Sequence, residues 1–103
     1  MRLIRRFARR VAETFDPDKI TLFGSRAYGT PHADSDVDIL VVMPARNELS
    51  QAIRICIAVE YQFPLDLIVR TPKHMKWLLD ERESFHTEIV TQGKVLYQRP
   101  RRK

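Results

Sequence analysis

Two aspartates stand two positions apart at the start of an apolar run. Asp36 and Asp38 open the segment DVDILVVM, residues 36–43, and Asp66 interrupts a second apolar run, LDLIV, in the same way. Because alternate residues of a β-strand point to the same side, Asp36 and Asp38 would project together. Three carboxylates that converge from neighbouring strands need cations, and hard oxygen ligands suit Mg²⁺ or Mn²⁺. Spacing alone leaves a plainer interpretation open, in which Asp36 ends a loop and Asp66 begins an exposed strand.

A glycine–serine pair precedes these aspartates. Gly24 ends the apolar run KITLFG, and Ser25 opens a predicted short helix, SRAY. Glycine lets the backbone approach a ligand closely, and the N–H groups that open a helix suit a phosphate, which Arg26 could also approach. Such a pair is common by itself. A phosphate-binding turn about a dozen residues before an Asp-x-Asp pair indicates phosphoryl or nucleotidyl transfer, in which metals bridge nucleotide phosphates to carboxylates.

Other polar residues give weaker signals. Asp34 and His32 lie between the two motifs and are interpreted as loop residues, since Mg²⁺ prefers oxygen to imidazole. His74 and His86 lack the spacing to carboxylates or cysteines that indicates zinc. The larger apolar residues near the C-terminus are expected in the core or against a partner: Trp77, Leu78, Phe85, Ile89 and Val90.

Hydrophobic periodicity predicts the elements that would position these groups. Helices are predicted at 2–15, 25–28, 47–61, 72–79 and 82–92, and strands at 19–24, 36–43, 64–71 and 94–98. Asn47 is a plausible N-cap for its helix. The 103 residues suit one α/β domain at 1–98 with a basic tail at 99–103.

Composition excludes several classes of protein. No run of about 18 apolar residues is present, and the N-terminus lacks the apolar core of a secretory signal. The single cysteine, Cys56, cannot form an internal disulfide, which fits a reducing cytoplasm, and its apolar surroundings favour a buried, inert thiol.

The net charge of +5 is concentrated at the two ends of the chain. Five arginines crowd the first predicted helix: Arg2, Arg5, Arg6, Arg9 and Arg10. This pattern is compatible with a nucleic-acid surface, a docking face for an acidic partner, or a solvated helix face. No aromatic residue is interleaved with these arginines, which disfavours binding of single strands.

The stretch GSRAYGTPHADSDVDILV resembles the signature of the DNA polymerase β nucleotidyltransferase superfamily, a Gly-Ser pair followed by two acids one residue apart. Within that superfamily the chain is similar to the minimal nucleotidyltransferases (MNT). These are short proteins often encoded beside a HEPN-domain partner as a toxin–antitoxin pair. The resemblance extends over nearly the whole chain, although Tyr28 stands where many relatives have arginine.

This resemblance implies a nucleotidyltransferase fold, a small mixed sheet with helices packed mainly on one face. It implies that Gly24 and Ser25 hold the nucleotide phosphates and that Asp36 and Asp38 hold the metals. Asp66 matches the third carboxylate, which ligates one metal and helps to deprotonate the attacking hydroxyl. The implied reaction transfers AMP from ATP, with Mg²⁺ or Mn²⁺, to a hydroxyl of a HEPN-domain partner.

Three classes of function remain open at this level. The first is active nucleotidyl transfer, for which the complete set of acids argues. The second is an antitoxin that neutralises its partner by binding alone. The third is a basic nucleic-acid-binding module, which the terminal arginines permit but the acidic cluster disfavours. The chain has no room for a second, acceptor-binding domain, so the acceptor surface is expected from a partner or from a homo-oligomer.

Overall fold

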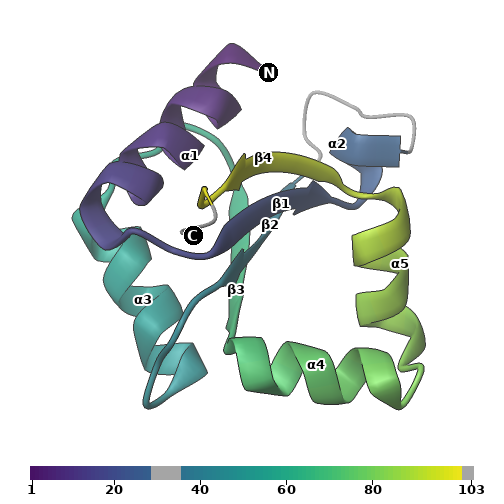
Figure 1. Cartoon of the computed structure of the whole chain (residues 1–103). Helices are drawn as coiled ribbons and strands as arrows, with labels where there is room; N and C mark the ends of the chain where they lie inside the picture. Colours follow the sequence, from purple (N-terminus) through teal and green to yellow (C-terminus); the bar gives the residue numbers. More distant parts are fainter. Residues whose placement is uncertain (29–35, 101–103) are drawn as a thin grey trace.

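The computed structural model describes residues 1–28 and 36–100. Nine helices and strands lie within this part of the chain (Figure 1). They are α1 (Arg2–Phe15), β1 (Lys19–Phe23), α2 (Ser25–Tyr28), β2 (Val37–Val42), α3 (Glu48–Ala58), β3 (Leu65–Arg70), α4 (Pro72–Asp80), α5 (Ser84–Gln92) and β4 (Lys94–Gln98). Their order is the one that hydrophobic periodicity predicts. The largest difference is at α3, which ends three residues early because Val59 is extended and turns its side chain into the core.

Side-chain caps explain where three of the helices begin. The Asn47 side chain accepts a hydrogen bond from the Ser50 amide at 2.8 Å, so its predicted capping role is confirmed. Thr71 accepts from the His74 amide at 3.1 Å and caps α4, which has a proline in its first turn. The Glu83 carboxylate accepts two amides at the start of α5, which therefore begins later than predicted.

The four strands form one mixed sheet in the order β3-β2-β1-β4. β2 and β3 run parallel, with α3 as the connection between them, whereas β1 is antiparallel to both β2 and β4. A parallel pair needs a long crossover, which α3 supplies. The predicted fold class, a small α/β domain with a mixed sheet, is confirmed.

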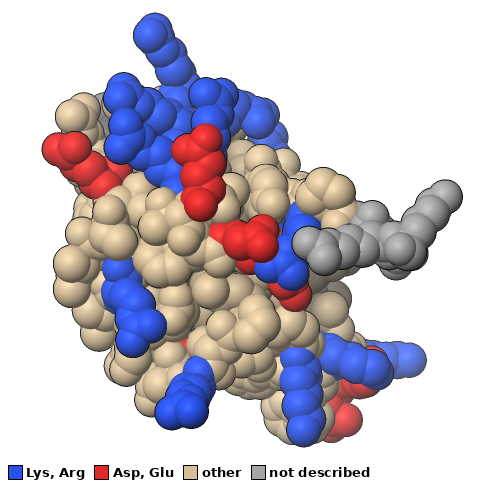
Figure 2. All heavy atoms as spheres, turned by 60° about the vertical axis from the view of Figure 1, so that its left-hand side comes forward, with Lys and Arg blue, Asp and Glu red and all other residues tan. Residues whose placement is uncertain are grey.

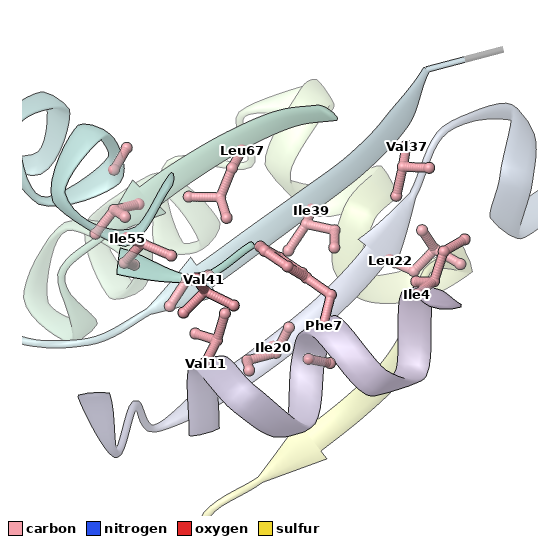
Figure 3. Close-up of a cluster of buried hydrophobic side chains, with 14 of the residues drawn as sticks. Ile4, Phe7, Val11, Ile20, Leu22, Val37, Ile39, Val41, Ile55 and Leu67 are labelled. Carbon is pink, nitrogen blue, oxygen red and sulfur yellow. The ribbon is translucent and has the colours of Figure 1, made fainter. Parts of the chain in front are cut away.

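Helices lie on both faces of the sheet, and the larger of the two cores is on the α1/α3 face. On one face, α1 and α3 pack on Ile39 and Val41 of β2 and on matching positions of β1 and β3 (Figure 3). On the other, α4 and α5 enclose a smaller cluster around Leu40, with Val42 against it. Because β2 is apolar on both sides, each side requires a helical cover.

A polar network ties α3, β3, α4 and α5 together at the carboxyl end of β3. The Glu48 carboxylate accepts from the Thr71 amide at 2.9 Å, lies 2.8 Å from His74 Nδ1, and is 3.8 Å from an Arg70 guanidinium nitrogen. The Arg70 Nε donates to Nε2 of buried His86 at 3.2 Å. His74 and His86, for which the sequence gives no role, therefore hold helices in place.

Several remaining predictions concern side-chain exposure. Leu78 and Ile89 are buried, while Trp77, Phe85 and Val90 are exposed. Cys56 is only half-buried, and this burial raises the pKa of its thiol, which keeps it protonated at neutral pH. None of the helices in the described part of the chain is long and apolar enough to cross a membrane.

Candidate active site

Asp38 and Asp66 are direct neighbours across the parallel strands β2 and β3. Both lie near the amino ends of their strands, and both alternate with the residues that face α1 and α3. They therefore share the α4/α5 side of the sheet. Asp36 precedes β2 by one residue and is exposed, as is Asp66, whereas Asp38 is half-buried. Asp38 and Asp66 are nearly thirty residues apart in the sequence, but the register places them side by side on paired strands.

The backbone turn that follows β1 lies against Asp38. Phe23 pairs with Asp38 in the antiparallel register, and Gly24 comes next with a φ of 75°. A Cβ atom at Gly24 would lie 2.1 Å from Asp38 Oδ2, so the carboxylate would have to move to make room for it. Glycine at this position is therefore favoured both by the backbone angle and by the carboxylate that occupies the space beside it.

Three carboxylates in one neighbourhood disfavour the charged form of the central one. Burial, the charge of Asp66 and the charge of Asp36, in that order, raise the pKa of Asp38 above its usual value. A divalent cation bound beside Asp38 would reverse this effect, since a positive charge favours the ionised carboxylate.

The donor set fits Mg²⁺ or Mn²⁺, although the described residues form no closed metal cage. Within residues 1–28 and 36–100, no three His, Cys, Asp or Glu side chains are grouped closely enough to enclose a metal ion. Mg²⁺ at nucleotide sites commonly takes one or two carboxylates, with phosphate oxygens and waters as the other ligands. Asp38 and Asp66, with oxygen donors in adjacent register positions, suit this open kind of site. The predicted metal triad stays a prediction.

The predicted phosphate-binding turn adjoins the carboxylates. Gly24 is followed at once by Ser25, the first residue of α2. The Gly24 carbonyl accepts from the Ala27 and Tyr28 amides at 3.0 and 3.2 Å, so the turn is closed by its own backbone. The first backbone amides of a helix have no hydrogen-bond acceptor within the helix. The amide of Ser25 would therefore be available to a phosphate bound near Asp38.

An aromatic pair beside the carboxylates was not predicted. Phe23 is the register partner of Asp38 and is buried on the same face of the sheet. The half-exposed Phe85 packs on it edge to face, with ring centroids 5.7 Å apart. One usable signal for Phe23 is its position directly before the Gly-Ser pair. Phe85 has no such signal, because only the packing of α5 on β1 places it there. His32 and Asp34, which the sequence predicts to be loop residues, lie outside the described residues.

Comparison with known proteins agrees with this arrangement. The family model for the nucleotidyltransferase domain matches residues 4–95, so the chain belongs to the nucleotidyltransferase domain family. A relative from Methanocaldococcus jannaschii, named "putative protein adenylyltransferase", is 33% identical in an alignment of 85 residues, and the match covers 77% of this chain and 77% of the relative. A crystal structure of a "putative nucleotidyltransferase" from Sulfolobus solfataricus has the same fold, with a TM-score of 0.65 and 22% identity. That match covers 95% of this chain and 79% of the other.

Proposed function

We propose that this chain is a metal-dependent nucleotidyltransferase that moves AMP from ATP to a hydroxyl group of a protein partner. The observation that carries the proposal is the pairing of Asp38 with Asp66 across β2 and β3, with the Gly24 backbone against Asp38. Family membership supports nucleotidyl transfer, and the name of the archaeal relative favours a protein acceptor.

Each residue of the site has a defined task in this reaction. Gly24 and Ser25 bind the phosphates of ATP through backbone amides and a hydroxyl. Asp36, Asp38 and Asp66 hold Mg²⁺ or Mn²⁺, which when bound neutralises charge on the phosphates. Exposed Asp66 faces the approaching acceptor and takes the hydroxyl proton. The acceptor oxygen bonds to the α-phosphorus, the bond from that phosphorus to the bridging oxygen breaks, and pyrophosphate leaves.

The acceptor in this proposal is a HEPN-domain protein that the chain controls as an antitoxin. An exposed apolar stripe on α3 supports a protein partner. Leu49, Ile53 and Ile57 are 72, 52 and 81% exposed and recur every four residues, so they form one stripe on the solvent side of the helix. Gathered aliphatic groups of this kind are typical of interaction surfaces. The stripe equally favours the second candidate function, neutralisation of the partner by binding alone.

Intact-mass spectrometry distinguishes these two functions. The chain is incubated with ATP, Mg²⁺ and a HEPN-domain protein, the proposed acceptor, and that protein is expected to gain one or more AMP units. Asp36→Asn and Asp66→Asn should abolish or greatly slow the gain. Asp34→Asn, which removes one charge outside the proposed triad, is the matched control and should retain it. An unmodified partner that is neutralised equally by the wild type and by Asp36→Asn would establish the binding antitoxin instead.

A binding measurement tests the metal assignment without turnover. Isothermal titration calorimetry with ATP is expected to show heat that depends on Mg²⁺ or Mn²⁺. The Asp36→Asn/Asp38→Asn variant should lose this dependence because it lacks two of the proposed ligands. Asp66→Asn should keep much of the nucleotide affinity, since its further role is toward the attacking hydroxyl. Equal metal-dependent binding in the double variant and the wild type would refute the assignment.

A further inference from the structure

The outer face of α1 carries an arginine band that the proposed reaction does not use. Its members, all exposed, are Arg2, Arg5, Arg6, Arg9 and Arg10. At 3.6 residues per turn they cover about 140° of the helix circumference and about 12 Å of its length. They lie opposite Ile4, Phe7 and Val11, which pack on the sheet (Figure 3). Figure 2 shows blue atoms crowded over the top of this face of the molecule, where α1 lies.

No carboxylate of residues 1–28 and 36–100 is within salt-bridge distance of the arginine band. Arg70 and Arg99, by contrast, pair with carboxylates elsewhere in the chain. The acids that border the band are Glu13 and Glu60, one in each of the grooves along its two edges. Each groove has two arginines for one acid, so the surface retains an excess of positive charge that would attract a polyanion.

The fold brings an aromatic ring from a distant part of the sequence to this surface. Tyr61, from the segment between α3 and β3, lines one groove together with Arg6 and Arg10. The Tyr61 residue is 40% exposed, yet its ring packs edge to face on Phe7, with ring centroids 6.0 Å apart, and against Phe63, with centroids 6.1 Å apart. A ring that is fixed on its inner side and open on its outer side can stack with a planar group at little cost in side-chain entropy.

The second groove repeats this composition on the other edge of α1. Arg5 and Arg9 line it with Leu96 and Tyr97 of β4, and it encloses about 380 Å³. Tyr97 is partly buried against the main core and so is also fixed in place. Each pair of arginines, four residues apart, thus has a tyrosine beside it.

From this arrangement we infer that the arginine band and Tyr61 bind single-stranded nucleic acid, with phosphates on the arginines and a base stacked on the tyrosine. Guanidinium groups bind phosphate oxygens through paired hydrogen bonds, and all five cations are arginine. Unstacked bases gain stacking energy on an exposed aromatic ring that lies beside such a cationic surface. An acidic polypeptide would use the charges but leave the ring without a function.

Fluorescence anisotropy tests the inference with a labelled 12-nucleotide oligouridine and the whole chain. Affinity should fall with salt, and the slope of log K against log salt should be about −2 to −3.5 if three to five phosphates are neutralised. Arg6→Gln/Arg10→Gln should make the slope less negative by about 1.4. The matched control Arg46→Gln/Arg54→Gln removes two exposed charges near and on α3 and should leave both slope and affinity nearly unchanged.

A second pair of variants tests the stacking role. Tyr61→Leu should weaken binding about 5- to 150-fold, whereas Tyr61→Phe, which keeps the ring, should bind like the wild type. Circular dichroism confirms that each variant is folded. Asp38→Asn should bind the oligonucleotide normally, which separates this surface from the proposed active site. Equal effects of the two arginine pairs, or polyglutamate that competes as well as the oligonucleotide, would overturn the inference.

Discussion

Alanine at Gly24 is the sharpest test of the site, because the added Cβ would both strain a left-handed backbone and press on a proposed catalytic side chain. The added Cβ would lie 2.1 Å from Asp38 Oδ2 and 3.1 Å from its Cγ, on a backbone with a φ of 75°. Ordinary contact requires the carboxylate to move by about 1 Å or more, which takes Asp38 away from its present rotamer.

The expected loss of stability follows from two costs. A left-handed backbone costs a non-glycine residue about 1–2 kcal/mol, and an off-rotamer side chain costs about 0.5–1.5 kcal/mol. Alanine also restricts the unfolded chain, which returns about 0.4–1 kcal/mol. The net loss is about 2 kcal/mol, equivalent to a fall in Tm of about 8–16 °C for a domain of this size. A displacement of about 1 Å at a reacting centre should lower the rate of AMP transfer about 100-fold.

A double-mutant cycle read by thermal unfolding separates the two costs. In an Asp38→Ala background the Oδ2 and Cγ atoms are gone, so Gly24→Ala should cost about 1 kcal/mol less than in the wild type. Gly93→Ala is the control, since its Cβ would meet Ile89, Thr21 and Leu22 and not Asp38. It should destabilise the fold but show no coupling to Asp38→Ala. Strictly additive costs for Gly24→Ala and Asp38→Ala would refute the proposed contact.

Three further predictions follow from the charges and the exposed surface. The raised pKa of Asp38 means that stability is lost as pH rises from below about 4 through that pKa. Asp38→Asn should therefore be more stable than the wild type at pH 7 by up to about 1 kcal/mol without metal, a difference that disappears near pH 3 in chemical denaturation. Glu48 is the opposite case: burial acts to raise its pKa, but hydrogen bonds from Thr71 and His74 outweigh this and lower it. The stability that ionised Glu48 contributes is present above about pH 4.5 and is lost as pH falls. Glu48→Gln should therefore lower the free energy of unfolding by about 1–2 kcal/mol at pH 7 and make that free energy less dependent on pH below about 4.5. Ile53→Ser should weaken partner binding at least tenfold in a pull-down titration and leave the Tm within about 2 °C, because the side chain is half in solvent.

Local sequence patterns were sufficient to predict the order of the helices and strands and to identify the proposed site residues. The apolar run at 36–43 shows alternation and length typical of a buried strand, and Asn47 and Thr71–Pro72 mark helix starts by hydrogen bonds to residues three positions away. The spacing of Asp36 and Asp38, with Gly24 and Ser25 before them, likewise predicts a phosphate and metal site from neighbouring residues alone.

The sheet order and register were decided only by the tertiary structure. Nothing local specifies that β2 lies between β1 and β3 or that Asp66 stands opposite Asp38, because strand pairing is set by how whole apolar faces meet. For the same reason the sequence could not assign α4 and α5 to the second face, or place Tyr61 beside the arginines of α1. Short-range periodicity determines which side of an element is apolar; the packing of distant segments determines what each polar side chain has as its neighbours.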